Sequence, residues 1–537
     1  MRFAVLSDTH YISKSTLYDD GARSPRDLLR HEINRKVMDD LKARTDVDTI
    51  LITGDLTDAG DLDSHREFAA LLQALKDSGK NVYVLTATHD FHYSRAWVSV
   101  YDQPVRYRER PWEKPWCDLD KTDFRGIVTE AFADLPAEKC APLVKPVASP
   151  DDLWEIYRPF GRDQAFSSCD SAYSYAVKLE EKLWCLMLNN NFRDIDANYD
   201  ASPTYSPACF RWIESIVRRA KEEGAFVFAC THHPLVPPVP AYKLGGTPRN
   251  MRNATVCHIL SDIGLSLVFS GHTHFADVAF GSSDRGNVLC NVTTPSICFL
   301  PPMWRLVDLD PEAHRLKLQA VPVEKSDAMQ FGEETLRAHF IREFVDDQKR
   351  KIDRLPHGLG RVVQGIRVKH LYPLCKAAAG LTKQEYAQIA DRRFFDIVMD
   401  LVINMQAGDG QYTPETPLCK FMMGLCAVAD SVLGTQPFYP IEKKLQGYTI
   451  SQIVEPMLYN NGIPDNDADF IFDRLPDARF VPPVYRSNAG DALMIVLSAA
   501  AILLSPLSPI AASLALPIMT LRKKAKKRRS PDLPERY

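Results

Sequence analysis

The amino-acid sequence predicts an α/β sandwich with mixed sheets, followed by a helical domain and then by an apolar segment. Three observations support this prediction. Short apolar segments alternate with helical segments over residues 1–322, helical patterns dominate residues 325–485, and no charged residue occurs between Ala492 and Leu521. At 537 residues, the chain is also longer than one compact core usually is, so several domains are expected.

Nine segments of the first part are predicted to be strands. Six are apolar at nearly every position, which is typical of strands buried on both faces. Helical segments lie between several of these strands; one begins at Ser24-Pro25 and another at Ser206-Pro207, where proline suits the first helical position. The last three strands have no long helix between them, so we expect mixed sheets. The nine segments are residues 1–7, 48–53, 81–87, 182–189, 225–231, 265–271, 288–294, 303–310 and 314–321.

Two regions lie outside this alternation. Residues 91–155 are irregular and rich in proline, aromatic and charged residues, which predicts an insertion that acts as a lid or substrate-binding element. Residues 325–485 carry apolar residues at helical spacing, and we expect a helical domain with these residues in its core. Its capping-box pairs are Thr382 with Glu385 and Thr449 with Gln452.

The C-terminal part has a different character. Residues 490–521 are apolar over more than the ~20 residues that a helix needs to cross a bilayer. The tail at residues 522–537 begins with a cluster of lysines and arginines, which predicts a cytoplasmic position for it. We therefore expect membrane lipid to be a partner of this segment.

The membrane topology has two open solutions. A single span would place the N-terminal domain outside, yet the strand at residues 1–7 leaves no room for a signal peptide. Pro506 and Pro509 allow a re-entrant hairpin, and alternatively the apolar arms lie in the interface while the basic tail binds anionic lipid. The 12 scattered cysteines fit a reducing compartment, so we predict attachment to the cell membrane with the N-terminal domain facing the cytoplasm.

The overall charge gives no attraction to a polyanion. The formal net charge is −4, and 25% of the residues are charged, as in ordinary globular proteins. No nucleic acid polymer is therefore expected as a partner.

Five polar motifs stand where predicted strands end. In open α/β sheets, this is the edge at which functional sites gather. Residues two apart on an extended backbone point the same way, so Asp8 with His10, and His272 with His274, form two pairs of ligands. The motifs are Asp8-Thr9-His10, Gly54-Asp55-Leu56-Thr57-Asp58, Thr88-His89-Asp90, Thr231-His232-His233-Pro234 and Gly271-His272-Thr273-His274.

These residue types favour a two-metal site. Carboxylates and imidazoles together suit Mn, Fe, Zn or similar divalent ions. A carboxylate such as Asp55 can bridge two ions about 3.5–4 Å apart, and such a pair polarises a phosphoryl group and lowers the pKa of bound water from about 15.7 towards ~7. We therefore predict hydrolysis of a phosphoester by a metal-bound hydroxide. The predicted ligands are Asp8, His10, Asp55, His232, His272 and His274.

The ordered motifs DTH, GDLTD, THD, HHP and GHTH resemble those of the calcineurin-like metallophosphoesterases. Within this family, the chain is most similar to the bacterial class III cyclic-nucleotide phosphodiesterase branch. The resemblance covers residues 1–322 and includes LITGDLTDAG, CFRWIES and TPSICFLPPMWRLVDLD. It implies a four-layer αββα sandwich with two divalent metal ions.

The resemblance also implies a role for each motif residue. Asp8, His10 and His274 would hold one ion, His232 and His272 the other, and Asp55 would bridge them. His89 would lie near the leaving-group oxygen as general acid or transition-state stabiliser, and Asp90 would orient its ring. For His233, a supporting or structural role is favoured over a ligand role.

One departure from the family pattern concerns Thr88. The third motif of the family normally reads Gly-Asn-His-Asp or Gly-Asn-His-Glu, and its Asn oxygen ligates the second metal. Here Ala87 and Thr88 precede His89, and a threonine hydroxyl is a poorer and differently placed ligand. Thr88 is therefore at most a weak ligand, and we expect a weaker or exchangeable second ion.

Three functions compete at this point. The leading hypothesis is hydrolysis of a phosphodiester such as a cyclic nucleotide. The apolar C-terminal segment keeps open a membrane-surface phosphatase or pyrophosphatase that acts on a lipid-linked substrate. Thr88 motivates a third alternative, a membrane-bound scaffold with a decayed metal site.

Overall fold

The structure is a computed structural model of the whole chain, and two compact units are recognised in it. The first comprises residues 1–238, 249–340 and 463–475, and the second comprises residues 239–248, 341–462 and 476–537. The structure describes residues 1–14, 25–58, 60–91, 97–100, 103–106, 140–142, 148–191, 204–236, 254–329, 331–354, 359–408, 412–433, 449–458 and 464–476.

The first sheet of the first unit has six strands in the order β16-β15-β14-β1-β2-β3. Strands β1, β2 and β3 are parallel, whereas β14, β15 and β16 run antiparallel to their neighbours. The sheet is therefore mixed, as the sequence predicts. Its strands are β1 (Arg2–Leu6), β2 (Thr49–Ile52), β3 (Asn81–Val84), β14 (Met303–Asp310), β15 (Arg315–Pro322) and β16 (Ala468–Ile471).

The second sheet has seven strands in the order β12-β13-β11-β10-β9-β8-β7. Strands β9, β10, β11 and β13 are parallel, and the outer strands are antiparallel to them. Its strands are β7 (Ser167–Cys169), β8 (Ser174–Glu180), β9 (Leu183–Leu188), β10 (Phe226–Thr231), β11 (Leu267–Ser270), β12 (Asp277–Ser282) and β13 (Val288–Thr293). All nine strands predicted from the sequence are present in the two sheets.

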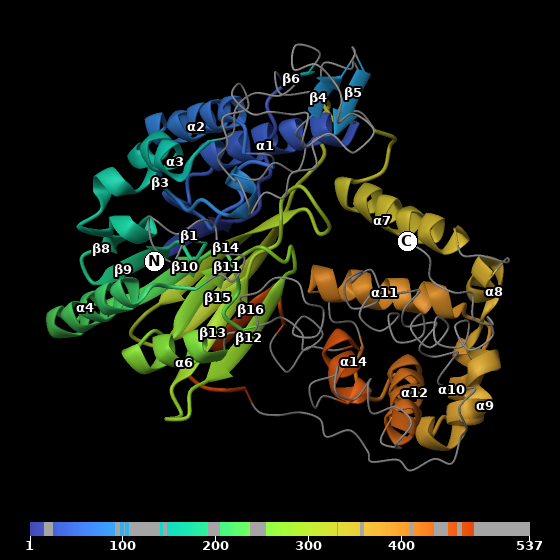
Figure 1. Cartoon of the computed structure of the whole chain (residues 1–537). Helices are drawn as coiled ribbons and strands as arrows, with labels where there is room; N and C mark the ends of the chain where they lie inside the picture. Colours follow the sequence, from blue (N-terminus) through green and yellow to red (C-terminus); the bar gives the residue numbers. More distant parts are fainter. Residues whose placement is uncertain are drawn as a thin grey trace, which may run out of the picture. The chain divides into compact units, whose positions relative to one another are not determined.

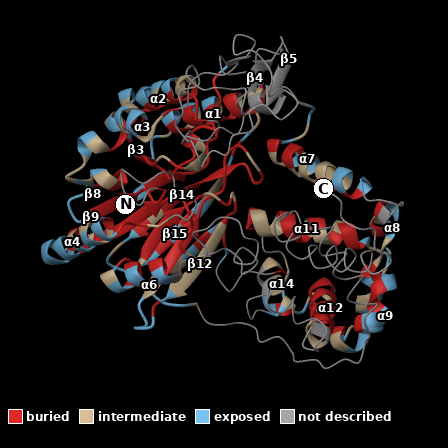
Figure 2. Ribbon diagram, viewed as in Figure 1, coloured by how far each residue is buried: buried red, intermediate tan, exposed pale blue. Residues whose placement is uncertain are grey.

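The main core lies between the two sheets. Phe3 of β1 stacks on Phe228 of β10 with ring centroids 5.6 Å apart, and both side chains are fully buried. Burial of such side chains is worth about 1.5–3 kcal/mol each. Figure 2 shows the central strands of the two sheets mainly as buried residues, whereas the edge strand β12 is mainly intermediate. Two sheets held face to face in this way bring their strand ends to a common edge.

Helices cover the outer faces of the sheets. Figure 1 shows α1 and α2 beside the first sheet and α4 and α6 beside the second. Ile213 and Ile216 of α4 and Trp184 of β9 belong to a second apolar cluster. Helix α4 begins at Pro207, as its sequence predicts, and Ser206 caps it by accepting a hydrogen bond from the backbone N–H of Cys209. These helices are α1 (Pro25–Ala43), α2 (Leu62–Asp77), α3 (Pro150–Ile156), α4 (Pro207–Glu223) and α6 (Ala254–Ile263).

Most of the predicted insertion at residues 91–155 lies outside the described residues. Its described part includes a small antiparallel sheet in the order β5-β4-β6. Its strands are β4 (Trp97–Val100), β5 (Gln103–Arg106) and β6 (Cys140–Pro142). Short 3-10 helices elsewhere in the first unit are η1 (Thr88–Phe91), η6 (Arg158–Phe160), η7 (Arg162–Gln164) and η8 (Asp170–Ala172).

The helical C-terminal region is confirmed. Thr382 and Glu385 form the predicted capping box at the start of α10. Thr449 and Gln452 exchange the predicted pair of hydrogen bonds at 2.9 and 3.1 Å. Residues 463–475 differ from the expected boundary, because β16 pairs with β15 and so belongs to the first unit. The helices are α7 (Leu336–Asp353), α8 (Leu359–Gly365), α9 (Val368–Ala379), α10 (Lys383–Ile389), α11 (Phe394–Ala407), α12 (Pro417–Leu433) and α14 (Ile450–Leu458).

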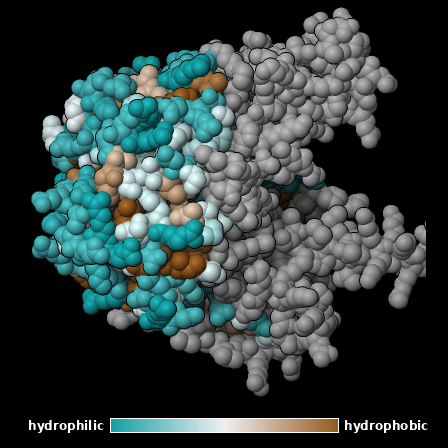
Figure 3. Space-filling view, turned by 60° about the vertical axis from the view of Figure 1, so that its left-hand side comes forward, coloured by the Kyte–Doolittle hydropathy of each residue, from teal (hydrophilic) through white to brown (hydrophobic). Residues whose placement is uncertain are grey.

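The predicted membrane segment at residues 490–521 and the tail at residues 522–537 lie outside the described residues. Within the described ranges, no helix is both long enough and apolar enough to cross a bilayer. On the face shown in Figure 3, the coloured part of the surface is mostly hydrophilic, with small apolar patches.

Candidate metal centre

The predicted ligands lie where strands of both sheets end. Asp8 and His10 follow β1, Asp55 follows β2, His232 follows β10, and His272 and His274 follow β11. Five of these six residues adopt the left-handed backbone region, which costs a non-glycine residue about 1–3 kcal/mol when it is strained. Their φ angles are 51° for Asp8, 42° for His10, 50° for Asp55, 68° for His272 and 60° for His274. Such clustering of unusual backbone marks a functional site.

A first group of ligands forms around Asp8. Its Oδ2 atom accepts hydrogen bonds from Ser7 Oγ at 2.5 Å and from the backbone N–H of His272 at 2.9 Å. Its Oδ1 atom lies 3.3 Å from Nε2 of His274 and 3.8 Å from Nε2 of His10. The two Nε2 atoms lie 3.1 Å from each other. One carboxylate oxygen and two imidazole nitrogens therefore converge on one place.

A second group forms around His232. Its Nδ1 atom lies 3.1 Å from the carbonyl oxygen of Thr53, and its Nε2 atom lies 3.2 Å from Nδ1 of His272. His233 lies in the same group, since one ligand atom from each of the three histidines lies within 4.8 Å of the others. The sequence favours a supporting or structural role for His233, and the structure brings it to the predicted ligands.

Asp55 lies between the two groups. Its Oδ2 atom is 3.2 Å from Nε2 of His232, and its Oδ1 atom accepts a hydrogen bond of 2.8 Å from the backbone N–H of His89. Ligand atoms of Asp8, Asp55 and His232 also come within 4.8 Å of one another. Asp55 therefore has the position that a bridging ligand requires.

Two glycines make this close packing possible. At Gly54, whose φ angle is 111°, an added Cβ would meet Nδ1 of His232 at 2.8 Å. At Gly271, an added Cβ would meet Ser7 Oγ at 1.7 Å and Asp8 Oδ2 at 2.4 Å. A side chain at either position would displace a predicted ligand or the residue that orients it.

His89 is held by a different partner from the one predicted. Its Nδ1 atom lies 2.9 Å from the backbone carbonyl oxygen of Asp58, a distance at which the ring N–H donates to that oxygen. The Asp90 carboxylate accepts hydrogen bonds from the backbone N–H groups of Ala87 at 2.7 Å and Thr57 at 2.8 Å. Asp90 therefore fixes the backbone of the loop, and the carbonyl of Asp58 orients the His89 ring.

Burial and neighbouring charges set the ionisation of the site. Burial lowers the pKa of His10 to about 4 and that of His272 to about 3, so both rings are neutral at pH 7. Burial opposes protonation of His232, but the Asp55 carboxylate outweighs it and raises the pKa to about 9. Burial raises the pKa of Asp90 to about 7, and the Asp55 charge adds to this effect.

The observed side chains fit divalent metal ions. Asp8 and Asp55 are almost completely buried carboxylates, and such charges are costly unless they are paired or bound to metal. Among the described residues, Asp8 Oδ1 and His272 Nε2 are buried atoms that make no hydrogen bond. Ring nitrogens of His10 and His274 face each other at 3.1 Å, and those of His232 and His272 at 3.2 Å, so a cation bound there could take a lone pair from each ring.

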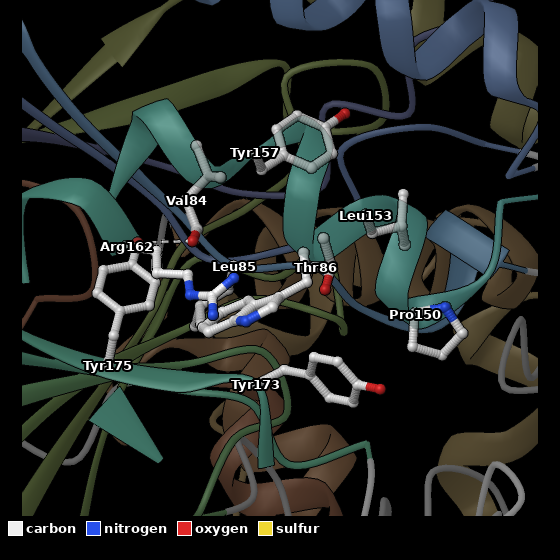
Figure 4. Close-up of a pocket in the computed structure, with 10 residues that line it drawn as sticks. Val84, Leu85, Thr86, Pro150, Leu153, Tyr157, Arg162, Tyr173 and Tyr175 are labelled. Atoms are coloured by element: carbon white, nitrogen blue, oxygen red, sulfur yellow. Dashed lines mark hydrogen bonds between the residues drawn. The ribbon is translucent and has the colours of Figure 1, made fainter. Parts of the chain in front are cut away.

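Thr88 has a buried Oγ1 atom that makes no hydrogen bond to any described residue. The small cavity in Figure 4 is a separate feature, with an internal volume of about 20 Å³, which is enough for about one water molecule. It is lined by Leu85, Trp154, Tyr157 and Arg162 among others, and none of the predicted ligands contributes to its wall.

Several supporting residues are not evident from the sequence alone. Oδ1 of Asp58 forms an ion pair of 2.7 Å with the guanidinium of Arg30 and lies 3.2 Å from Nδ1 of His10. Phe299 stacks on His274 with ring centroids 4.5 Å apart. Asn190 contacts His233, and the polar run after β9 that contains it is the one signal that could have revealed it.

Comparisons with known proteins give one family and several similar structures. Residues 1–276 match the sequence model of a family described as calcineurin-like phosphoesterase. No curated protein sequence matches the chain. A dimetal phosphatase from Danio rerio is similar at 12% identity over 60% of this chain and 96% of that chain, with a TM-score of 0.34. A purple acid phosphatase from yellow lupin (Lupinus luteus) seeds is similar at 12% identity over 60% of this chain, which spans about half (51%) of the lupin protein, with a TM-score of 0.32.

Proposed function

This chain belongs to the calcineurin-like phosphoesterase family, and we propose that it hydrolyses a phosphodiester with the help of two divalent metal ions. Its family makes it a phosphoester hydrolase. The observation that carries the metal dependence is the convergence of the six predicted ligands in two groups on either side of Asp55. We propose Mn, Fe, Zn or similar divalent ions as the metals.

The residues divide between the two ions. Asp8, His10 and His274 would hold the first ion, His232 and His272 the second, and Asp55 would contact both. When bound, such a pair polarises a phosphoryl group and makes water a nucleophile at neutral pH. The protein supplies fixed ligand positions, because backbone hydrogen bonds and close packing hold Asp8 and Asp55 in place.

His89 is placed to handle the leaving group. Its backbone N–H holds Asp55, and its Nδ1–H donates to the Asp58 carbonyl, so the ring stays beside the predicted ligands. Burial opposes protonation of the ring, but the charges of Asp55 and Asp58 outweigh it and raise the pKa of His89. A protonated ring can give the proton on Nε2 to the leaving oxygen as the phosphoester bond breaks.

The substrate proposal rests on the order of the motifs. Their similarity to the cyclic-nucleotide phosphodiesterase branch favours a diester, and a cyclic nucleotide is the first substrate to test. Fold and metal ligands alone do not select the substrate. The ligands and His89 are retained together, which favours a working enzyme over a scaffold with a decayed site.

The apolar C-terminal sequence favours a second candidate substrate class. Residues 490–521 followed by the basic tail support attachment to the cell membrane, with the first unit facing the cytoplasm. A phosphatase in that position meets lipid-linked phosphoesters. This candidate shares the metal centre with the first and differs from it only in the substrate.

A substrate panel tests the proposal. Full-length protein in detergent is assayed with Mn²⁺ or Zn²⁺ on a chromogenic phosphodiester, a chromogenic phosphomonoester, cyclic nucleotides and a lipid-linked pyrophosphate. We expect diester hydrolysis that falls by more than a hundredfold in Asp55→Asn, because this carboxylate lies between both ligand groups. The matched control is Asp48→Asn, at an exposed residue. Equal rates for Asp55→Asn and the wild type, or no turnover on any substrate, would contradict the proposal.

A further inference from the structure

The second ligand group contains one imidazole beyond His232 and His272, the two that the resemblance assigns to the second ion. Thr88 stands where the family has an asparagine, so the expected amide ligand is missing. His233, which directly follows the predicted ligand His232, instead joins the group of His232 and His272. His233 therefore offers this group a further imidazole where the expected amide is absent.

His233 is positioned as a ligand rather than as a surface residue. It is only 2% exposed, and its ring centroid lies 4.2 Å from that of His272 and 5.0 Å from that of His232. Three imidazoles packed this closely bring their ring nitrogens near one another, and a cation shared between them would stabilise this arrangement.

The ring of His233 is also oriented as a metal ligand is. Its Nδ1 atom lies 3.0 Å from Oδ1 of Asn190. The amide oxygen accepts a hydrogen bond from Nδ1–H, and the lone pair of the ring is then on Nε2. His232 is oriented in the same way by the carbonyl oxygen of Thr53, at 3.1 Å. Metal-binding histidines nearly always have such an oxygen partner on their second nitrogen.

We propose that His233 completes the second metal site in place of the missing amide, so that this ion is held by His232, His233, His272 and Asp55. The proposal rests on the proposed two-ion function and goes beyond it. It replaces the sequence-based expectation of a weakened second site with a site of different chemistry.

The donor sets of the two ions then differ. The first has two carboxylates and two imidazoles, whereas the second has one carboxylate and three imidazoles. Imidazole suits Zn and Fe, whereas carboxylate suits Mn and Mg. The second site is therefore expected to retain Zn²⁺ and to lose Mn²⁺ more readily than the first site does.

Metal titration of variants tests this assignment without relying on activity. Chelator-treated full-length protein is titrated with Zn²⁺ and, separately, with Mn²⁺, and bound ions per chain are measured by equilibrium dialysis and elemental analysis. For His233→Gln and His233→Phe, we expect the second Zn²⁺ to bind at least about tenfold more weakly and the first to be unchanged. The control Thr88→Val removes the hydroxyl at constant shape and is expected to bind both ions as the wild type does.

A ligand swap sharpens the test. Thr88→Asn, introduced into His233→Gln, restores the amide of the family pattern and is expected to recover the second ion. If the His233 variants keep the second ion at wild-type affinity, or if Thr88→Val weakens it equally, the proposal is overturned. If the wild type binds fewer than two ions, the proposed function itself fails, which separates the two outcomes.

A spectroscopic measurement on the wild type avoids any risk that a variant misfolds. In the Co²⁺-loaded protein, each ligating imidazole contributes one strongly shifted ring N–H proton to the proton magnetic resonance spectrum. We expect five such protons, from His10, His232, His233, His272 and His274. Four protons, with none assigned to His233, would overturn the proposal.

Discussion

The backbone N–H of His272 donates a hydrogen bond of 2.9 Å to Oδ2 of Asp8 across 264 residues of sequence. The two residues follow β11 of the second sheet and β1 of the first. The bond therefore ties the ends of both sheets together at the metal centre. It also turns Oδ1 of Asp8 towards the Nε2 atoms of His10 and His274.

Gly271→Ala is expected to break this relationship. The new Cβ would meet Ser7 Oγ at 1.7 Å and Asp8 Oδ2 at 2.4 Å, so Asp8 or the β11 loop must move. Metal affinity, measured by titration, should fall by at least about tenfold, as it does when ligand support is lost. Gly332→Ala is the control, since its Cβ would meet nothing within 4 Å. Equal metal affinity in both variants would show that the packing is not needed.

His89→Gln is expected to lower kcat by about 10²–10⁴, because positioned acid–base groups typically contribute that much. The number of bound metal ions should not change, since the proposed ligands of both ions are other residues. Steady-state kinetics with metal analysis on the same sample measures both quantities. His258→Gln on α6 is the matched control. Loss of an ion in His89→Gln would make His89 a ligand instead.

Binding of metal is expected to stabilise the folded protein. Several predicted ligands have left-handed backbone angles, and two of them are buried carboxylates. An ion that binds only to the folded arrangement stabilises it by mass action. At a metal concentration of about 100 Kd, one ion contributes about 2.7 kcal/mol. Thermal unfolding with and without Zn²⁺ should show a clear rise in Tm for the wild type and a much smaller one for Asp55→Asn. Identical rises would exclude Asp55 as a ligand.

Asp465 gives the first unit a pH-dependent stability. Burial raises the pKa of Asp465 to about 7, although the hydrogen bond from the Val278 N–H and the charge of Arg305 both lower it. The folded state therefore keeps a proton that the unfolded state releases above pH about 4. This stabilisation is fully present below pH about 4, and it is lost progressively as the pH rises from there through 7.

Asp465→Asn removes this titration and preserves an oxygen that can accept from Val278. The stability advantage of the wild type over the variant should shrink by on the order of 2 kcal/mol between pH 5 and 7. Urea unfolding at several pH values measures it. A constant difference across this range would show that Asp465 does not hold a proton in the folded state.

Much of the fold could be predicted because its strands are buried on both faces. β9 is buried at all six positions, and its apolar sequence shows this directly. The pairing of β16 with β15 could not be predicted, because it joins residues about 150 apart and β16 itself is short. For this reason, the sequence alone places residues 463–475 in the helical region, whereas the structure places them in the first unit.

The side chains predicted to bind metal could be identified from the sequence, whereas the backbone groups that orient the site could not. The six ligands follow from residue types at strand ends, and the structure brings them together. The predicted contact between Asp90 and the His89 ring followed only from their adjacency. Within η1 the two side chains take different partners, and a backbone carbonyl that no side chain announces orients His89.

The most direct test of the two-ion hydrolase is a titration in which bound metal and hydrolysis are followed in the same samples. Chelator-treated protein receives Zn²⁺ or Mn²⁺ in steps, and diester hydrolysis is measured at each step. We predict negligible hydrolysis without metal and a rate that reaches its plateau at two bound ions per chain. Full hydrolysis in the chelated protein, or a plateau with fewer than two ions bound, would contradict the account.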